Sequence, residues 1–285
     1  MTSTSKTAVL TGSTGGIGLE IARILARQGW NLVLVNRSQE KTNFQLEELQ
    51  KSYPSQEFAG FIANLMDTSD INRVAEEIGS RYTKISALYN IAGLLTDKRI
   101  MSPQNVEGHF ALNTLAPYIL TQRLRKQLSA GAQDVRQSVV VNFSSSAVSG
   151  VKELDVTTLT NPESIGGLMG AYAKSKAALT VVSAAMKETL LKDGILIQIV
   201  DPGPTKTSMT SSSDGMPWFL ILLRPLIFKS AKFQAQRLFD AVETAVSEGE
   251  SGLFISEGKR KPYPSIALNK SIQTEIKLLL DTQVQ

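Results

Sequence analysis

Short apolar runs alternate along this chain with longer segments in which apolar residues recur every three to four positions. The short runs are rich in Val, Ile and Leu without polar alternation, which is typical of strands buried on both faces of a parallel sheet. The longer segments have the helical period and would cover that sheet on both sides. The pattern therefore predicts an α/β fold: a doubly wound, Rossmann-type parallel sheet of about seven strands with helices on both faces. The strands are expected at Thr7–Leu10, Asn31–Val35, Glu57–Ile62, Ile85–Tyr89, Ser138–Phe143, Leu196–Val200 and Leu253–Ile255.

Two long polar connections and one proline interrupt this alternation. The connections follow predicted strands, and open α/β sheets hold their ligands at the carboxyl ends of strands. We expect an inserted loop around 146–168 and a substrate lid around 204–229, both within a single domain spanning 1–285. The helical segment after Pro103 contains Pro117, which should kink the helix near Asn113 by freeing a backbone carbonyl.

Composition excludes several kinds of chemistry. The 285 residues include no cysteine, which rules out disulfides, thiolate catalysis and zinc–thiolate sites, and no metal site is predicted. Lys and Arg number 30 against 26 Asp and Glu, and their scatter indicates a mixed-charge surface rather than a nucleic-acid-binding one. His109, the only histidine, is expected to be a helix residue without catalytic duty.

The most apolar stretch, 217–228, is interrupted by Arg224 and Pro225 and is shorter than the ~20 residues that cross a bilayer. The N-terminus contains no apolar signal-peptide core. A soluble, cytoplasmic protein is expected, with peripheral membrane contact through 217–228 as an option. The same stretch is consistent with a lid over a lipophilic substrate, a contact between subunits, or a helix packed on the core.

A glycine-rich turn joins the first predicted strand to the first helix. Residues 11–18 read Thr-Gly-Ser-Thr-Gly-Gly-Ile-Gly. Glycine lets the backbone turn sharply and lets a pyrophosphate approach the helix N-terminus, where free N–H groups favour anions. No Lys-Ser/Thr pair follows, which disfavours a nucleotide-hydrolysing P-loop. The turn predicts a dinucleotide site with contacts at Gly12, Ser13, Thr14, Gly16, Ile17 and Gly18.

The end of the second strand bears on which dinucleotide binds. A site for NAD places Asp or Glu there to hold the ribose hydroxyls, whereas this chain has Asn36-Arg37. A carboxylate would repel a 2′-phosphate, and Arg37 can bind one through charge-assisted hydrogen bonds. NADP(H) is therefore favoured over NAD(H), the alternative being that Arg37 is an ordinary surface arginine.

Tyr172 and Lys176 are four residues apart on a strongly helical segment, so they project from one face. A free tyrosine has a pKa near ~10, and bringing it to neutrality takes roughly 4 kcal/mol. An ammonium ~5 Å away at an effective dielectric of ~20 supplies about 3 kcal/mol of this. We expect Lys176 to lower the pKa of Tyr172 for acid–base work. The alternative, common for this spacing alone, is a half-buried tyrosine beside a solvated lysine.

Six motifs occur in a fixed order along residues 6–255. They are the glycine turn, Asn90-Ile91-Ala92-Gly93, Asn113, Asn142-Phe143-Ser144-Ser145, the Tyr172/Lys176 pair and Asp201-Pro202-Gly203. Together they resemble the short-chain dehydrogenase/reductase family in its compact one-domain form. The residues at the end of the second strand, Val35-Asn36-Arg37, and the surroundings of Asn113 look most like the retinol-dehydrogenase-like branch of that family.

The resemblance implies catalytic roles. Tyr172 would donate a proton to a carbonyl during reduction or accept one from an alcohol during oxidation. Lys176 would lower the pKa of Tyr172 and hold the nicotinamide ribose. Ser145 would hydrogen-bond the substrate oxygen, with Ser144 and Ser146 as adjacent competitors for that role.

The resemblance also implies that Asn113 anchors a water relaying protons to Lys176. Further cofactor contacts would be Asn36, Arg37, Asn64, Leu65, Asn90, Ala92, Gly93, Tyr172, Lys176, Pro202, Gly203, Thr205 and Thr207. The chain departs from the family in having Asn64-Leu65 where Asp-Leu is usual, although the asparagine can still hydrogen-bond. A separation of 27 positions between Ser145 and Tyr172 is a second departure, about twice the usual spacing.

The predicted function is an NADP(H)-dependent oxidoreductase that transfers a hydride between the cofactor and the carbonyl or alcohol carbon of a lipophilic small molecule. One alternative is a catalytically silent NADP(H)-binding sensor or scaffold, which would not need the Ser, Tyr, Lys and Asn set. Another is an epimerase or dehydratase of the same family, which the short chain disfavours. The resemblance allows a homo-oligomer.

Overall fold

The computed structural model describes residues 6–135, 137–206 and 228–284. Of the sequence-based expectations, Thr207 and most of the lid expected around 204–229 lie outside these residues. Within them, no helix is long and apolar enough to cross a membrane.

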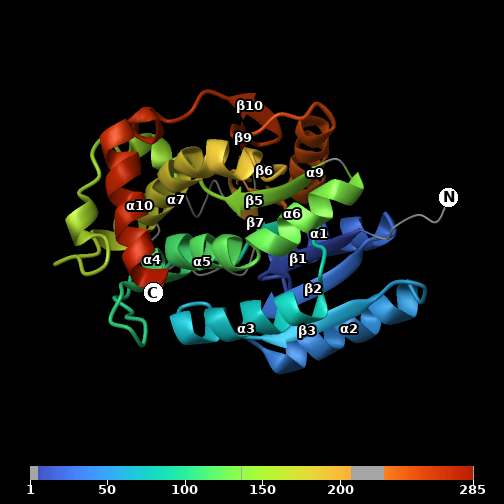
Figure 1. The fold of residues 1–285 in the computed structure, drawn as a ribbon. Coiled ribbons are helices and arrows are strands. Elements are labelled where there is room, and N and C mark those ends of the chain that lie inside the picture. Colours follow the sequence, from blue (N-terminus) through green and yellow to red (C-terminus); the bar gives the residue numbers. More distant parts are fainter. Residues whose placement is uncertain (1–5, 136, 207–227, 285) are drawn as a thin grey trace.

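The centre of the fold is a sheet that has eight strands within the described residues, in the order β10-β9-β6-β5-β4-β1-β2-β3 (Figure 1). Every neighbouring pair is parallel except β10 and β9. The strand order reverses direction between β1 and β4, which is the topological switch point where doubly wound sheets bind ligands. The predicted fold class is confirmed. The strands are β1 (Thr7–Thr11), β2 (Asn31–Asn36), β3 (Phe58–Ile62), β4 (Ala87–Asn90), β5 (Ser138–Phe143), β6 (Ile195–Asp201), β9 (Leu253–Ser256) and β10 (Lys259–Lys261).

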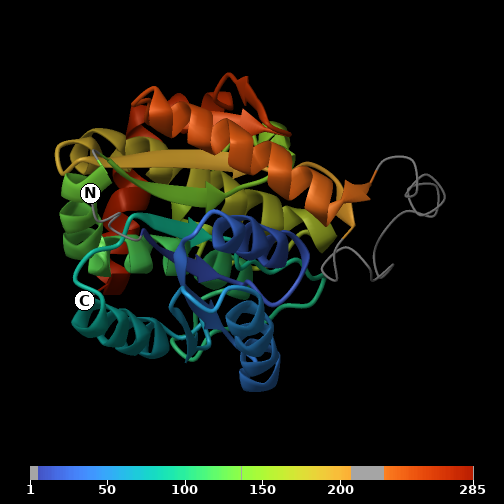
Figure 2. The ribbon, with the colours of Figure 1, turned by 90° about the vertical axis from the view of Figure 1, so that its right-hand side faces the viewer.

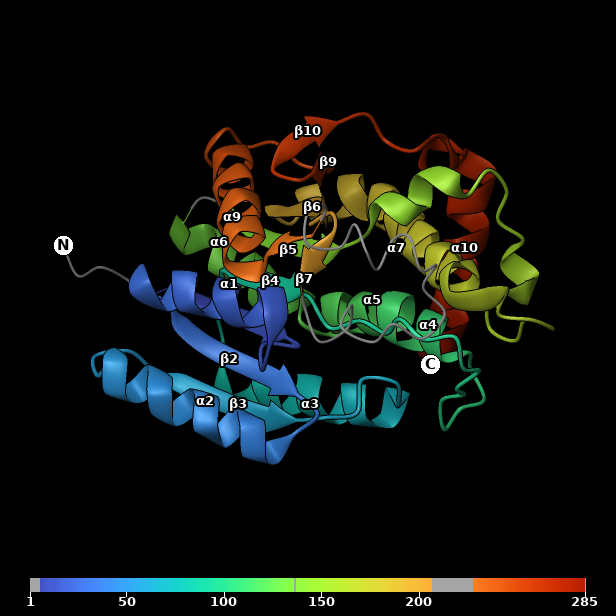
Figure 3. The ribbon, with the colours of Figure 1, turned by 180° about the vertical axis from the view of Figure 1, so that it is seen from behind.

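Helices cover both faces of the sheet because successive strand residues point to opposite sides. Leu10 and Leu34 pack with α1 (Gly16–Arg27), α2 (Gln39–Ser52) and α9 (Ala231–Ser247), the layer nearest the viewer in Figure 3. Val9 and Val33 pack with the opposite layer. This opposite layer comprises α3 (Thr68–Arg81), α5 (Ala116–Arg123), α6 (Arg125–Val135), α7 (Gly167–Leu191) and α10 (Lys270–Val284). In Figure 2, α3 and α10 of the opposite layer lie left of the sheet, and α1 and α2 lie right of it.

Short elements connect these layers near the carboxyl ends of the strands. The segment before α5 consists of one turn of helix, α4 (Gly108–Phe110), followed by a π-helix, η1 (Ala111–Leu115). The connection from β5 to α7 contains two 3₁₀ turns, η2 (Ser146–Gly150) and η3 (Val156–Thr158). A third, η5 (Ser265–Leu268), precedes α10, and β7 (Thr205–Lys206) pairs with β8 (Lys229–Ser230).

Strand β10 corrects the expected strand number from seven to eight. It pairs antiparallel with β9 across a turn at Glu257 and Gly258, which have φ of 49° and 73°. All three of its residues are exposed. The Lys-Arg-Lys run therefore carries none of the apolar alternation from which strands are predicted. Arg260 of β10 forms ion pairs with Glu250, at 2.7 Å, and with Glu248.

Candidate functional site

The glycine turn is folded tightly and leaves space in front of α1. Gly12 and Gly16 have φ of +68° and +55°, a region that favours glycine. A Cβ on Gly18 would lie 2.2 Å from the carbonyl oxygen of Gly12, so the helix approaches the turn too closely for any other residue. In contrast, a Cβ on Gly15 would meet nothing within 4 Å. Because no described side chain caps the N-terminus of α1, its N–H groups face this space, and the cradle fits a pyrophosphate.

Asn36 holds the glycine turn in place from the end of β2. Its Oδ1 accepts a hydrogen bond from the backbone N–H of Ser13 at 2.8 Å, and its side chain is buried. Gln45 of α2 donates to the carbonyl oxygen of Ser13 at 3.0 Å. Asn36 and Ser13 were both expected to contact the cofactor, and the side chains of both bond inside the protein. They shape the turn, whereas neighbouring Arg37 is exposed and forms no ion pair with any residue that the structure describes.

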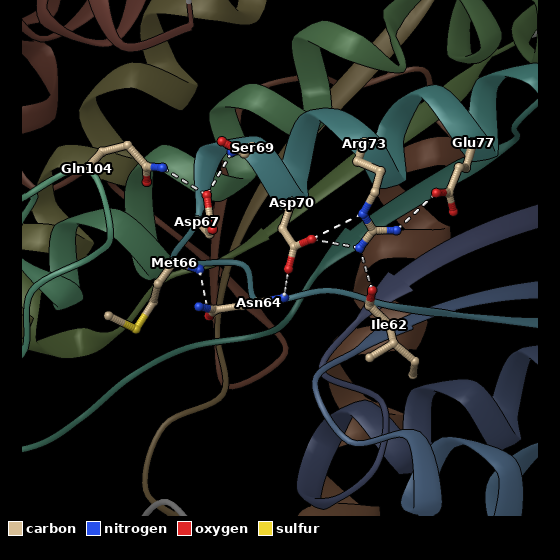
Figure 4. A network of polar contacts seen from close by, with 9 residues as sticks. All are labelled: Ile62, Asn64, Met66, Asp67, Ser69, Asp70, Arg73, Glu77 and Gln104. Atoms are coloured by element: carbon tan, nitrogen blue, oxygen red, sulfur yellow. Dashed lines mark hydrogen bonds and ion pairs between the residues drawn. The ribbon is translucent and has the colours of Figure 1, made fainter.

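Asn64 lies exposed at the end of β3, in the network of Figure 4. Its backbone N–H donates to Asp70 at 2.9 Å, and its side-chain oxygen accepts from the N–H of Met66 at 3.2 Å. Arg73 bonds the same Asp70 carboxylate at 2.7 Å. These two hydrogen bonds hold the pKa of Asp70 below its usual value, and the bond from Asn64 has the larger effect. The turn that carries Asn64 is therefore fixed by a carboxylate, while Leu65 beside it is buried in the core.

The end of β4 is fastened to both of its neighbours. Thr11 of β1 accepts hydrogen bonds from the backbone N–H groups of Ile91 and Ala92, at 3.0 and 3.1 Å. Asn90 donates to Asn142 of β5 at 2.8 Å, and its own Oδ1 is buried without a partner among the described residues. The segment 90–93, which the sequence assigned to the cofactor, is thus held in one position beside the glycine turn.

Asn113 lies in the π-helix, where the sequence predicted a kink. Pro117 has no N–H to give the carbonyl of residue 113, and the chain responds with one wider turn, a feature frequent at functional sites. The Asn113 side chain is fully buried. It accepts from the N–H of Leu94 at 2.7 Å and donates to the Leu94 carbonyl and to Ser175 of α7, both at 3.0 Å. Its side chain is fully used in joining this loop to α7, so the backbone carbonyl is the group left for the predicted water.

The three serines after β5 have different surroundings. Ser144 is buried and bonds Thr180 of α7 at 2.7 Å, and Ser146 is exposed. Ser145 is half-buried, and it lies close enough to Tyr172 for a hydrogen bond from its side chain to lower the pKa of the tyrosine. Of the three, the structure brings Ser145 to the tyrosine.

Tyr172 and Lys176 share the first turns of α7, but the expected lowering of the tyrosine pKa by the lysine is not found. Burial raises the pKa of Tyr172, a hydrogen bond from Ser145 opposes this, and the charge of Asp201 adds to it. Lys176 is buried, and its Nζ donates to the carbonyl of Phe143 at 2.6 Å. Burial also lowers the pKa of Lys176 to about 7. Removal from water is therefore the largest influence on both groups, and Lys176 is not among the groups that shift the pKa of Tyr172.

The end of β6 forms the last wall of the site. Asp201 accepts from the N–H of Gly203 at 2.9 Å, and Gly203 adopts a φ of +68°. Thr205 is buried and bonds the carbonyl of Gly203 at 2.9 Å. Pro202, Gly203 and Thr205 thus lie at the carboxyl edge where the sequence places the nicotinamide.

A cavity of about 740 Å³ lies elsewhere, between α5, α6, α7 and α10. Its residue Met186 is 14 positions beyond Tyr172 on α7, which is about 21 Å along the helix axis. This cavity is therefore distinct from the cluster around Tyr172.

Comparisons with known proteins agree with this arrangement. The family model for short chain dehydrogenases matches residues 6–217. The chain belongs to the short-chain dehydrogenase family. It is 28% identical to retinol dehydrogenase 12 of Mus musculus, over 93% of this chain and 82% of that protein. It is 24% identical to polyprenol dehydrogenase of Danio rerio, over 95% and 84%. These similarities confirm the predicted resemblance to the retinol-dehydrogenase-like branch.

Among solved structures, NADPH-bound carbonyl reductase from chicken fatty liver has a TM-score of 0.68 with 20% identity, covering 91% of this chain and 99% of that one. As a short-chain dehydrogenase, the protein is an oxidoreductase that uses a nicotinamide cofactor on carbonyl or alcohol groups of a small-molecule substrate.

His109 is a residue that sequence reasoning left without a role. It is fully buried, and the centroid of its ring lies 6.5 Å from that of Tyr172, at an interplanar angle of 76°. One feature of the sequence could have indicated that His109 lies near the site. It precedes Asn113 by four residues, so the two lie on one helical face.

The buried lysine predicts a dependence of stability on pH. Lys176 has a pKa of about 7 in the folded protein, against ~10.4 for a lysine in an unfolded chain. Between these values the unfolded state binds a proton that the folded state does not. The free energy of unfolding of the cofactor-free protein should therefore rise with pH across this window, by up to about 1.4 kcal/mol per pH unit from this group.

Urea unfolding at about pH 7 and about pH 9 measures this rise. The variant Lys176→Met lacks the titrating amine and should show a smaller rise than the wild type. Equal rises in the two proteins would mean that Lys176 is charged in the fold.

Proposed function

We propose that the protein is an NADP(H)-dependent oxidoreductase that transfers a hydride between its cofactor and the carbonyl or alcohol carbon of a lipophilic small molecule, with Tyr172 as the acid and base. The observation that carries this proposal is that Ser145 lies within hydrogen-bonding reach of Tyr172, which shares a face of α7 with the buried Lys176. These three side chains converge at the carboxyl edge of the sheet, within the same fold region as the glycine turn. A sensor that only bound the cofactor would have no need of this cluster.

The residues divide the chemistry of carbonyl reduction between them. When bound, the nicotinamide supplies the hydride, which leaves a negative charge developing on the substrate oxygen. The Ser145 hydroxyl holds that oxygen and the Tyr172 hydroxyl donates its proton to it. Because burial raises the pKa of Tyr172, the phenol is protonated at neutral pH, as a proton donor must be. Lys176, whose pKa is about 7, can return a proton to the phenolate, with the Asn113 carbonyl anchoring the intervening water.

Arg37 supports the choice of NADP(H). Its guanidinium stands exposed at the end of β2, one residue after Asn36, whose amide carries no charge. A 2′-phosphate on the adenosine ribose would meet a cation and no carboxylate at this position, which favours it over an unmodified ribose.

The relatives support a lipophilic substrate. Two of them are named for retinol and polyprenol, which are long apolar alcohols. The apolar stretch 217–228 falls within the lid proposed around 204–229, and the residues around 146–168 form the inserted loop beside Ser145. We place the enzyme in the cytoplasm, with 217–228 in peripheral contact with the membranes where such substrates dissolve.

A series of aldehydes of increasing apolar length tests this proposal. With NADPH as cofactor, kcat/KM should rise along the series, by up to about tenfold for every 1.4 kcal/mol of added apolar burial. Retinal should rank above short aldehydes, and NADH should support slower turnover than NADPH. A flat series would remove the lipophilic assignment, and no turnover of any member would favour the sensor.

A further inference from the structure

His109 is held in a single tautomer by its two hydrogen bonds. Its Nε2 lies 3.2 Å from the backbone nitrogen of Thr96, whose N–H can only donate. Nε2 must therefore carry a lone pair. Its Nδ1 lies 2.7 Å from Oε1 of Glu107, a carboxylate that can only accept, so Nδ1 carries the proton. The imidazole is neutral and both of its nitrogens are engaged.

Glu107 is equally constrained. It is buried, with its second oxygen accepting from the N–H of Phe110 at 3.1 Å and its own N–H bonded to the carbonyl of Thr160 at 2.7 Å. Burial acts to raise the pKa of this carboxyl, but the hydrogen bonds from His109 and the backbone hold it below its usual value. Glu107 and His109 thus join the loop after β4 and the connection around Thr160 to the helical segment that leads to Asn113.

The ring of His109 also contacts the reacting tyrosine. The two rings meet edge to face with their centroids 6.5 Å apart, an arrangement in which aromatic rings attract each other. Tyr172 lies near the start of α7, and among the described residues its hydroxyl is restrained by a hydrogen bond with Ser145. A ring packed against its side limits sideways movement of the phenol and keeps its oxygen beside Ser145.

We propose that His109, locked by Glu107 as the neutral Nδ1–H tautomer, is a positioning residue that aims the Tyr172 hydroxyl at the substrate oxygen. His109 exchanges no proton with the substrate, since neither nitrogen is free. The inference rests on the proposed function, because it assumes that Tyr172 is the acid.

Three variants distinguish the effect of the His109 ring from the effect of its hydrogen bonds. His109→Gln removes the ring and keeps an amide near the Thr96 N–H. The double variant Glu107→Gln/His109→Phe restores a ring against Tyr172 and leaves no buried charge unpaired. Val106→Ala is the control, because Val106 is buried and directly precedes Glu107 in the chain, so its truncation costs stability while leaving the His109 ring and its hydrogen bonds in place.

We expect His109→Gln to lower kcat about tenfold while the Kd for NADPH changes by less than about twofold. The double variant should recover part of that loss, and Val106→Ala should lower Tm and leave kcat unchanged. A kcat for His109→Gln equal to that of the wild type would overturn the inference, as would an equal loss of kcat in Val106→Ala. If Tyr172→Phe keeps its activity, the proposed function fails instead, whatever the His109 variants do.

A measurement on the unaltered protein does not depend on how the variants fold. Because the chain has one histidine, ¹⁵N-labelled histidine gives a single pair of ring resonances in the NMR spectrum. The inference requires a protonated Nδ1 and an unprotonated Nε2 at neutral pH. A proton on Nε2 would contradict it.

Discussion

Tyr172→Phe is expected to lower kcat for carbonyl reduction by about 10³-fold while leaving the Kd for NADPH within about threefold. Phenylalanine keeps the ring, including its edge contact with His109, and removes only the hydroxyl that would protonate the substrate oxygen. The loss should therefore fall on the chemical step. Steady-state assays with an aldehyde, together with NADPH titration by fluorescence, measure the two quantities separately.

Tyr118→Phe is the matched control, because it also removes the hydroxyl of a buried tyrosine. Tyr118 bonds Asp281 of α10, on the side of the molecule with the 740 Å³ cavity. This variant should lose some stability and keep its kcat. Retained activity in Tyr172→Phe would remove the acid–base assignment, and equal losses in both variants would indicate a general effect of losing a buried hydroxyl.

Arg37→Ala is expected to raise the Kd for NADPH by about 10- to 100-fold and the Kd for NADH by less than about twofold. The difference follows from the 2′-phosphate, which NADH lacks and which a guanidinium binds through charge-assisted hydrogen bonds. Because Arg37 is exposed, the preference for NADPH should shrink as salt is raised.

Arg27→Ala controls for the loss of one positive charge, since Arg27 is exposed at the far end of α1. It should change neither Kd by more than about twofold. If Arg37→Ala weakened NADPH and NADH equally, Arg37 would have no role in recognising the 2′-phosphate.

Features that depend on local sequence were predictable. The buried strands are continuous apolar runs. The glycine turn is specified by Gly12, whose positive φ favours glycine, and by Gly18, where a Cβ would collide with the carbonyl oxygen of Gly12. The four-residue spacing of Tyr172 and Lys176 places them on one face of α7 whatever surrounds them.

Features that depend on the assembled fold were not predictable. Whether Asn36 faces a cofactor or the turn depends on where Ser13 lies. The direction in which the pKa of Tyr172 shifts depends on how much water the fold removes, which spacing does not reveal. His109 reaches Tyr172 only because α4 packs against α7, a contact between segments 63 positions apart. Strand β10 forms through pairing with β9 and a turn at Gly258 rather than through apolar burial.

Hydride transfer itself is tested most directly with NADPH that carries deuterium at C4 of the nicotinamide, prepared in each of the two stereochemical forms. The protein is incubated with each form and retinal, and the alcohol produced is analysed by mass spectrometry. We expect one deuterium at the former carbonyl carbon from one form and none from the other. An absence of deuterium from both forms, with NADPH bound, would contradict it.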